Sequence, residues 1–470
     1  MDEHRVASGA GKAFGALGGE DVEVYRAVFE ELQAQGRLKL EGIVYDPYAD
    51  VEQEGELLAL VKQGAPVQEA DEGEHVELIL PRTAFYVEAG GQVSDTGLVV
   101  SVNEPRWEVR IEDVRRPAAG VVSHVGTVLR GTPRVGDQVI ATVDIQRRRD
   151  IMRNHTATHL LHAELHAVLG EHARQAGSLV APDRLRFDFT HPEAVTPQQL
   201  EQIEAGVSRN ILENYRLNIR VKSRDEALAE GAMALFGEKY GEVVRTITIG
   251  SSDPISYELC GGTHVDETAD IGLFLITSES SAAAGVRRIE AVTGRYAYEL
   301  VQRRLRTLKQ AASLLTSSLD EVPAKVSQVQ DELESARKRI NALRQEVAAA
   351  EFTRRLDEVP QVKGVPALAA LLPNADADTL RAMTDRFRQR YPSGVVVLAS
   401  APDNRPVIIA AVTEDLVKRG LSAGDLVKTV AQVVGGGGGG RPTLAQAGGK
   451  DAAKLPEALE RVQEYLNDKL

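Results

Sequence analysis

RNHTATHLLHAELH, residues 153–166, contains four histidines spaced four, three and four residues apart, namely His155, His159, His162 and His166. On a helix this spacing places all four on one face, and the local pattern predicts a helix over residues 149–169. Two imidazoles one turn apart can bind the same Zn²⁺ ion at about 2.0–2.1 Å. The spacing leaves the pair open, because His159 with His162 or with His166 satisfies it as well as His155 with His159.

The segment CGGTH, residues 260–264, offers the remaining ligands of a tetrahedral site. Cys260 is the single cysteine of the 470 residues, which excludes internal disulfides and fits a reducing compartment. Gly261 and Gly262 allow a tight turn that points Cys260 and His264 the same way. A buried thiol and packing histidines explain each half of the pattern separately, whereas both halves together favour a metal. Thr156, rather than Glu, follows His155, which disfavours a zinc protease of the HExxH type.

The flanking segments predict a multidomain α+β protein with five parts. Residues 1–37 are expected to be an N-terminal helical tail or linker. Short runs separated by Gly, Pro and Asp predict a small β-barrel over residues 38–145. An α+β domain that contains the zinc ligands follows at 146–295, then a helical coiled-coil subdomain at 296–356 and a C-terminal α/β globular module at 357–470. The expected helices outside 149–169 are 22–32, 197–214, 227–235, 376–390, 422–433 and 455–468. The expected strands are 185–190, 216–222, 243–250 and 271–279 in the part 146–295, and 395–398 and 407–412 in the part 357–470.

Apolar residues three and four apart run from Leu305 to Ala350 and predict a coiled-coil seam. Pro323 interrupts this pattern, and proline is tolerated in a first helical turn, so two helices are expected at 296–317 and 321–355. Such a seam needs a partner in the same chain or in another. A homodimer through the C-terminal helical and globular region is therefore a hypothesis.

The overall charge does not exclude a polyanionic partner. The net charge is −14, but residues 1–80 hold 18 Asp and Glu against 6 Lys and Arg, so most of the acidity lies there. The tract VVGGGGGGRPTLAQAGGKD, residues 433–451, lacks the Gly-Lys-Ser/Thr of a P-loop. Its hexaglycine reads either as a flexible linker or, given Arg441 and Pro442, as an ordered loop whose N–H groups approach phosphates. Neither a signal peptide nor an apolar run of bilayer length is evident, and a cytoplasmic location is expected.

Several motifs together resemble the editing domain of the alanyl-tRNA synthetases and the related free-standing AlaX deacylases. TAFYVEAGGQVSDTG, residues 83–97, resembles the preceding β-domain, although Pro is usual at the position of Ala84. The tract 433–451 resembles the glycine-rich signature of the family's C-terminal domain, called C-Ala. The editing-domain motifs are RNHTATHLLH (153–162), QAGSLV (175–180), RLRFDF (184–189), ELCGGTHV (258–265) and GVRRIEAVTG (285–294).

This resemblance implies one Zn²⁺ per chain, bound by His155, His159, Cys260 and His264, with His162 and His166 left as ordinary helix-face residues. It implies that Thr158 and Gln175 are the polar catalytic groups beside the amino acid. For Thr158, a hydrogen bond to its own helical turn is an equal alternative. Weaker candidates for the editing site are Gln92, Asp95, Ser178 and Asp188, the last either orienting a ligand or pairing within a strand. Gly437, Gly438, Arg441, Lys450, Arg303 and Arg304 are candidate contacts to tRNA.

The implied function is editing of mischarged tRNA(Ala). An alanine pocket rejects glycine and serine weakly, because one methyl or hydroxyl is worth only about 1–3 kcal/mol. A second site then hydrolyses the Ser-tRNA(Ala) and Gly-tRNA(Ala) esters, as part of alanine–tRNA ligase. The ligase's aminoacylation domain does not fit into residues 1–37, so it is expected to be absent from this chain. A free-standing AlaX-type protein and a non-catalytic tRNA-binding or dimerising appendage with structural zinc are the alternatives.

Overall fold

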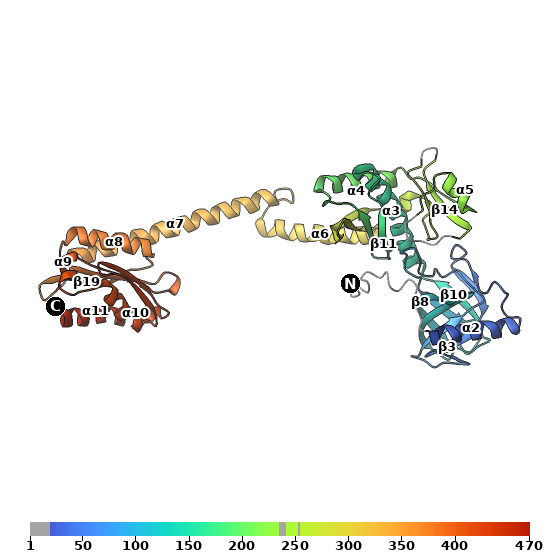
Figure 1. Cartoon of the computed structure of the whole chain (residues 1–470), viewed down its shortest axis with the longest axis horizontal. Coiled ribbons are helices and arrows are strands. Elements are labelled where there is room, and N and C mark those ends of the chain that lie inside the picture. The colour runs from blue at the N-terminus through green and yellow to red at the C-terminus, as the bar shows by residue number, and fades with distance from the viewer. Residues whose placement is uncertain (1–18, 235–240, 252–253) are drawn as a thin grey trace. The chain divides into compact units, whose positions relative to one another are not determined.

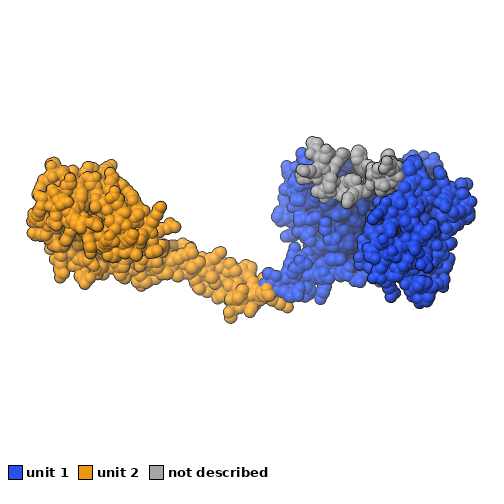
Figure 2. All heavy atoms as spheres, turned by 90° about the horizontal axis from the view of Figure 1, so that it is seen from below, with its two compact units in different colours: residues 1–307 blue, residues 308–470 orange. Residues whose placement is uncertain are grey.

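The computed structural model describes residues 19–234, 241–251 and 254–470. The chain divides into two compact units, residues 1–307 and residues 308–470 (Figure 2). Each unit mixes helices with β-sheets (Figure 1), as expected for a multidomain α/β protein. Within the described ranges, no helix is both long and apolar enough to cross a membrane.

The first half of unit 1 is an antiparallel sheet covered by helix α2 (Gly19–Ala34). Tyr25, Val28 and Leu32 of α2 share one buried core with the sheet, and Trp107 is among its largest fully buried side chains. Short β1 (Val44–Tyr45) pairs with β6 (Arg82–Thr83) beside it. The strand-rich region and the helix over 22–32 are thus confirmed, and closure into a barrel stays a prediction. The sheet order is β2 (Glu52–Glu56), β10 (Gln138–Val143), β7 (Gly97–Ser101), β8 (Glu108–Ala118), β9 (Val121–Arg130), β5 (His75–Ile79), β3 (Ala59–Lys62) and β4 (Ala65–Val67).

His124 on β9 makes the stability of this sheet pH-dependent. Its ring is fully buried, its Nδ1 lies 3.1 Å from the carbonyl oxygen of Leu78, and its Nε2 lies 2.7 Å from Oγ1 of Thr83. Burial lowers the pKa of His124 from 6.5 to about 4. The folded state therefore binds the proton less readily than the unfolded state, and His124 contributes stability that is present above pH 6.5 and is lost as the pH falls through 4.

We expect the free energy of unfolding to fall by about 2–3 kcal/mol between pH 7 and pH 4.5 because of His124. Urea denaturation of the wild type and of His124→Gln at both pH values measures this contribution. The glutamine variant should have a lower free energy of unfolding than the wild type at pH 7. Its free energy of unfolding should fall less between pH 7 and pH 4.5, since it has no imidazole to protonate. Equal losses in the two proteins would contradict the prediction.

The second half of unit 1 is built around helix α3 (Ile145–Leu169), which packs against α4 (Pro197–Leu212) and against strands of both sheets of this half. Helix α3 begins four residues before the predicted start, because the side chain of Asp144 caps the N–H of Arg147 at 3.0 Å. One antiparallel sheet has the order β11 (Gln175–Val180), β12 (Leu185–Thr190), β17 (Val286–Thr293) and β16 (Phe274–Ala283), and the other the order β13 (Leu217–Ser223), β14 (Val243–Ile249) and β15 (Ser256–Leu259).

Two predicted elements of this half need correction. The strand expected over 271–279 begins only at Phe274, because residues Thr268–Ile271 form the 3₁₀ turn η1. The helix expected over 227–235 is α5 (Arg224–Ala229), which begins earlier because Ser223 caps it and which ends at Ala229; residue 235 lies outside the described residues.

Unit 2 is a six-stranded sheet with helices on both faces (Figure 1). Helix α10 (Ala423–Val433) and α11 (Leu455–Lys469) belong to one buried core, and α8 (Ala377–Arg390) with the end of α7 (Val322–Asp357) to the other. Short α9 (Glu414–Lys418) follows the fourth strand. The order is β18 (Gln361–Val362), β19 (Val365–Leu371), β20 (Val395–Ser400), β21 (Val407–Val412), β23 (Leu444–Gly448) and β22 (Gly437–Arg441), with β19 and β20 parallel.

The hexaglycine is neither a linker nor a loop, since most of it forms edge strand β22. Two of its glycines are required by close approach: a Cβ on Gly438 would lie 2.3 Å from Cα of Ala447, and one on Gly440 would lie 2.6 Å from Cα of Ala445, whereas a Cβ on Gly437 or Gly439 would meet nothing within 4 Å. Both distances are shorter than any real Cβ contact. The strand therefore offers an exposed backbone without side chains, except at Arg441, at the edge of the sheet.

The region of the predicted coiled-coil seam forms two helices and not one continuous helix, as predicted. Helix α6 (Gly294–Leu315) ends before Ser318 and α7 starts at Val322, with Pro323 in its first turn. The apolar seam of α7 is half exposed, for example 51% at Leu333 and 50% at Ile340. A partner for this seam, and with it a homodimer, stays a prediction.

Candidate metal centre

Four buried side chains of unit 1 converge on one point. His155 and His159 come from consecutive turns of α3, and Cys260 and His264 come from the loop after β15. One ligand atom from each of the four lies within 4.8 Å of the others, and each residue is at most 7% exposed. Tertiary structure thus selects His155 with His159 from the four helix histidines as the pair that meets the cysteine loop.

The atoms that face the centre are Nε2 of the imidazoles and Sγ of the cysteine. Sγ of Cys260 lies 3.3 Å from Nε2 of His155 and 3.4 Å from Nε2 of His264. The edge of a tetrahedron around Zn²⁺ with one sulfur and one nitrogen is about 3.5 Å long. Nε2 of His159 is buried and has no hydrogen-bond partner among the described residues. The distances fit a metal ion at the centre, and Nε2 of His159 is free to bind it, although within the described ranges Nε2 of His162 and of His166 is likewise buried without a partner.

Each imidazole is held from behind through Nδ1. Oε1 of Gln92 lies 2.7 Å from Nδ1 of His155, and a carboxylate oxygen of Glu258 lies 2.9 Å from Nδ1 of His159. Oγ1 of Thr156 lies 3.1 Å from Nδ1 of His264. Gln92 and Glu258 accept from Nδ1 of their histidines, which leaves Nε2 of each ring facing the centre. Metal-bound histidines usually show this arrangement.

The electrostatics of the cluster favour a cation among these groups. Burial raises the pKa of the Cys260 thiol, but the neighbouring His155 and His264 outweigh it and hold the pKa well below its usual value. Burial would lower the pKa of His159, yet Glu258 overcomes this and raises it to about 10. The centre therefore carries a thiolate. Despite burial, which raises it, the pKa of Glu258 is held well below its usual value by His159 and His162, so Glu258 is a second anion behind His159. A thiolate and three imidazoles are donors that Zn²⁺ binds well.

Gly262 is required by the packing of the ligand loop. A Cβ at this position would lie 2.0 Å from Cε1 of His155, although the backbone there is not left-handed. A Cβ on the adjacent Gly261 would meet nothing within 4 Å. The two glycines of one loop thus differ in whether they tolerate a side chain.

We expect Gly262→Ala to displace the loop or the His155 ring and to reduce metal affinity by about 10–100-fold, comparable to the loss of a group that orients a ligand. Gly261→Ala, the matched control, should retain wild-type affinity. Competition with a chromophoric chelator measures both. Equal affinity in the two variants would contradict the steric argument.

A tyrosine and an arginine hold the outer side of the same loop. The hydroxyl of Tyr48 donates to the carbonyl oxygen of Gly261 at 2.6 Å. Nη1 of Arg245 donates to the carbonyl oxygens of Cys260 at 3.0 Å and Gly262 at 2.8 Å. The guanidinium of Arg245 also lies over the Tyr48 ring, 4.1 Å from its centroid. Three successive carbonyls of the loop are thereby fixed by two side chains.

The residues expected in the editing pocket are differently engaged. Oγ1 of Thr158 donates to the carbonyl oxygen of Asn154 at 2.8 Å, which is the bond to its own helical turn considered above. Gln175 and Ser178 are partly buried on β11, and Nε2 of Gln175 lies 3.2 Å from Oγ of Ser178. No catalytic role of these residues follows from these contacts, and their roles stay predictions.

Three weaker candidates make contacts within the protein, Asp188 in the strand pairing given above as its alternative, and the editing roles of the three stay predictions. Gln92 is fully buried, and its amide contacts His155 and Thr263. Asp95 is paired with Arg148. Asp188 pairs with Arg288 at 2.6 and 2.8 Å, and the carboxylate that orients a ligand is Glu258 instead.

Glu258 was the residue missed from the sequence. It lies two positions before Cys260 at the end of a strand, and residues two apart in a strand point to the same face. This two-residue period was the signal in the sequence that could have identified Glu258. Glu258 also explains why His162 is not an ordinary surface residue: it is 2% exposed, and its Nδ1 lies 3.5 Å from the Glu258 carboxylate. His166 is partly buried next to it, with 4.4 Å between the two ring centroids.

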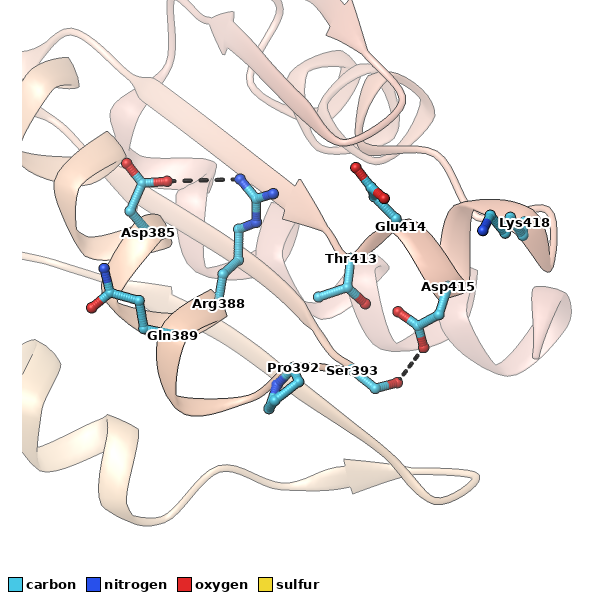
Figure 3. A pocket seen from close by; sticks show the side chains of 9 residues that line it. All are labelled: Asp385, Arg388, Gln389, Pro392, Ser393, Thr413, Glu414, Asp415 and Lys418. Atoms are coloured by element: carbon cyan, nitrogen blue, oxygen red, sulfur yellow. Dashed lines mark hydrogen bonds and ion pairs between the residues drawn. The ribbon is translucent and has the colours of Figure 1, made fainter.

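Unit 2 contains a separate hollow between the end of α8 and α9 (Figure 3). Its charges are largely satisfied locally, since Asp385 and Arg388 approach to 3.7 Å and Oγ of Ser393 donates to Asp415 at 2.6 Å. It is lined without histidine or cysteine. The chemistry-bearing cluster therefore lies in unit 1 and not in this hollow.

The residues expected to contact tRNA are exposed. Gly437, Gly438 and Arg441 lie on edge strand β22, with Lys450 shortly after β23. Arg303 and Arg304 lie on α6. Their exposure is compatible with binding a polyanion, and the contacts themselves stay predictions.

Three sequence families match successive parts of the chain. Residues 20–147 match the family described as tRNA synthetases class II (A), residues 244–290 match the threonyl and alanyl tRNA synthetase second additional domain, and residues 364–468 match the DHHA1 domain. The second match includes Cys260 and His264 of the cluster.

Curated relatives match nearly the whole chain. It is 44% identical over 465 residues to the alanine–tRNA ligase of Myxococcus xanthus, which covers 99% of this chain and 50% of the relative. It is 41% identical over 449 residues to the same enzyme of Oceanobacillus iheyensis, covering 96% and 50%. The chain thus spans about half the length of these relatives. Among solved structures, the C-Ala domain of Aquifex aeolicus alanyl-tRNA synthetase is 30% identical over 23% of this chain and 97% of that chain, with a TM-score of 0.22.

Proposed function

The chain belongs to the alanyl-tRNA synthetase family, and from this premise we propose that it hydrolyses the ester bond of mischarged tRNA(Ala), with Ser-tRNA(Ala) and Gly-tRNA(Ala) as substrates. The observation that carries the proposal is the buried cluster of His155, His159, Cys260 and His264, whose second half lies within the matched second additional domain. One Zn²⁺ is the metal that best suits these donors.

The reaction needs little beyond orientation and charge stabilisation. The oxygen of a water molecule bonds to the ester carbonyl carbon, the bond from that carbon to the ribose oxygen breaks, and the ribose oxygen receives a proton. The products are free serine or glycine and uncharged tRNA. When bound, Zn²⁺ would supply either a rigid anchor for the ligand loop or Lewis acidity toward an oxygen.

The protein's own groups fix the geometry of this site. Gln92 and Glu258 hold the rings of His155 and His159, so the Nε2 atoms point inward without rearrangement. Tyr48 and Arg245 fix the loop that carries Cys260. Thr158 and Gln175 remain our proposed polar groups beside the amino acid, by their match to the family's motifs. The preorganised cluster keeps the reacting ester in one orientation.

The C-terminal module is proposed to bind tRNA through phosphate contacts. Its edge strand β22 is an exposed all-glycine backbone that ends in Arg441. Absence of side chains lets a phosphate approach the strand closely. Arg303 and Arg304 of α6 lie in unit 1 and are proposed as separate phosphate contacts. Contacts of this kind weaken steeply with salt.

The proposal is tested by incubating the purified chain with Ser-tRNA(Ala) and with Ala-tRNA(Ala) and measuring release of the labelled amino acid. We expect fast hydrolysis of the seryl ester and slow hydrolysis of the alanyl ester. Binding of tRNA without hydrolysis of either ester would instead support a tRNA-binding appendage with structural zinc. A free-standing deacylase and an editing domain separated from its synthetase are both expected to hydrolyse the ester of added tRNA. The assay therefore tests whether the chain hydrolyses the ester, and it does not distinguish these two kinds of protein.

A further inference from the structure

Tyr48 has an unusual position for an aromatic side chain. It lies in the loop after β1, it is 50% exposed, and its hydroxyl bonds to the carbonyl of Gly261, the neighbour of Cys260. Arg245 covers one face of the ring at 4.1 Å. Because Arg245 covers one face, the ring is open to solvent from its other side, while its hydroxyl end touches the loop that carries Cys260.

The ligand loop itself borders open space at Gly261, whose carbonyl Tyr48 holds. Gly261 has no side chain, and a Cβ built there would meet nothing within 4 Å. The ring cannot swing away, because the hydroxyl bond and the guanidinium hold it in place. A half-exposed, rigid aromatic face beside an open space is the arrangement on which nucleic-acid bases stack.

We propose that Tyr48, backed by Arg245, is the stacking platform for the base of the 3′-terminal nucleotide of the aminoacylated RNA; this rests on the proposed function. One ribose separates the ester from that base, and the carbonyl that Tyr48 holds belongs to Gly261, the residue directly after Cys260. An ester at the cluster thus brings its base to the ring. Arg245 contributes twice, since a cation stacked on an aromatic ring is attracted to it and also adds positive charge near the phosphate of the same nucleotide.

The test compares two serine esters with the full chain, seryl-adenosine and serine methyl ester, of which the second has no base. We expect Tyr48→Leu to lower kcat/KM for seryl-adenosine roughly 5- to 100-fold, mainly through KM, because stacking on one base is of that size. Loss of the hydroxyl that holds the Gly261 carbonyl affects both esters alike, so the readout is the ratio of the two kcat/KM values, which should fall by this factor. Tyr48→Phe keeps the ring and should keep the preference for the adenosine ester. Tyr298, 56% exposed on α6, is the matched control, and Tyr298→Leu should behave as wild type.

A purely structural role would give a different result. If Tyr48 only holds the ligand loop, Tyr48→Leu lowers both rates equally and Tyr48→Phe shares the defect, which would overturn the proposal. Photo-crosslinking of an azidoadenosine ester to the wild type needs no variant to fold. Labelling at Tyr48 supports the platform, and labelling only elsewhere overturns it.

A binding measurement separates this inference from the proposed function. The non-hydrolysable 3′-seryl-amide of adenosine is titrated into wild type and Tyr48→Leu, and serine amide serves as the ligand without a base. If the wild type binds the adenosine amide more tightly than serine amide and than Tyr48→Leu binds it, but hydrolyses neither ester, the deacylase function is refuted and the stacking role of Tyr48 is supported. Hydrolysis of both esters with no contribution of the base to binding would retain the deacylase and refute the platform.

Discussion

Replacing Cys260 by Ala is expected to abolish metal binding and, with it, hydrolysis of Ser-tRNA(Ala). Sγ of Cys260 lies 3.3 Å from Nε2 of His155 and 3.4 Å from Nε2 of His264. Its thiolate is the negatively charged donor among the four candidate ligands. Losing a group that merely orients a ligand costs about 10–100-fold in affinity or activity. Losing the thiolate ligand itself should therefore cost more than about 100-fold in both.

Zinc content is measured by atomic absorption after dialysis, and hydrolysis by release of labelled serine. His172→Gln is the matched control, since His172 is an exposed histidine that pairs with His191 rather than with the cluster. Its zinc content and rate should equal those of the wild type. Cobalt substitution gives an independent readout, because the thiolate-to-cobalt absorption band should be absent from Cys260→Ala. A variant that folds, lacks zinc and still hydrolyses the ester at the wild-type rate would refute the assignment.

Arg148→Met is expected to be the most destabilising single change in unit 1, by about 3–5 kcal/mol, because it leaves the buried carboxylate of Asp95 without its partner. Arg148 is 4% exposed and Asp95 is 1% exposed. Nε of Arg148 lies 2.9 Å from both carboxylate oxygens, and its other nitrogens donate to the carbonyls of Pro47 at 2.8 Å and Ala84 at 2.7 Å. One guanidinium thus ties helix α3 to the loops of the eight-stranded sheet.

Urea denaturation of the variants measures this effect. Arg134→Met is the control, since Arg134 and Glu69 form an exposed ion pair at 2.9 Å, and pairs of this kind contribute below about 1 kcal/mol. The double variant Arg148→Met/Asp95→Leu should recover part of the lost stability, because neither charge is then buried alone. A loss equal to that of Arg134→Met would show that Asp95 does not depend on Arg148.

The Arg148–Asp95 ion pair also lies next to residues that support the metal centre. The loop that follows Pro47 carries Tyr48, and Asp95 lies three residues after Gln92. Tyr48 and Gln92 both hold the ligand loop or a ligand. The eight-stranded sheet therefore supplies part of the cluster's support, although all four candidate ligands come from the second half of unit 1.

The sequence by itself predicted α3, the turn formed by CGGTH and the region of strands before them, because each depends on local periodicity or on glycine. It also brought together the four candidate ligands, although spacing left the helix pair open until the family resemblance was considered. Two helices in place of one rod followed from Pro323, whose missing N–H and fixed backbone angle act locally.

Only the tertiary structure decided which residues stand behind the ligands. Glu258 and Gln92 reach His159 and His155 from elements 99 and 63 positions away in the chain, so no local pattern pairs them. Tertiary contacts likewise assigned Asp95 and Asp188 to arginines, since a buried carboxylate must be paired wherever the fold places it. Most of the hexaglycine is a strand because it pairs with β23, and only this pairing brings Ala445 and Ala447 too close for a side chain at Gly440 and Gly438.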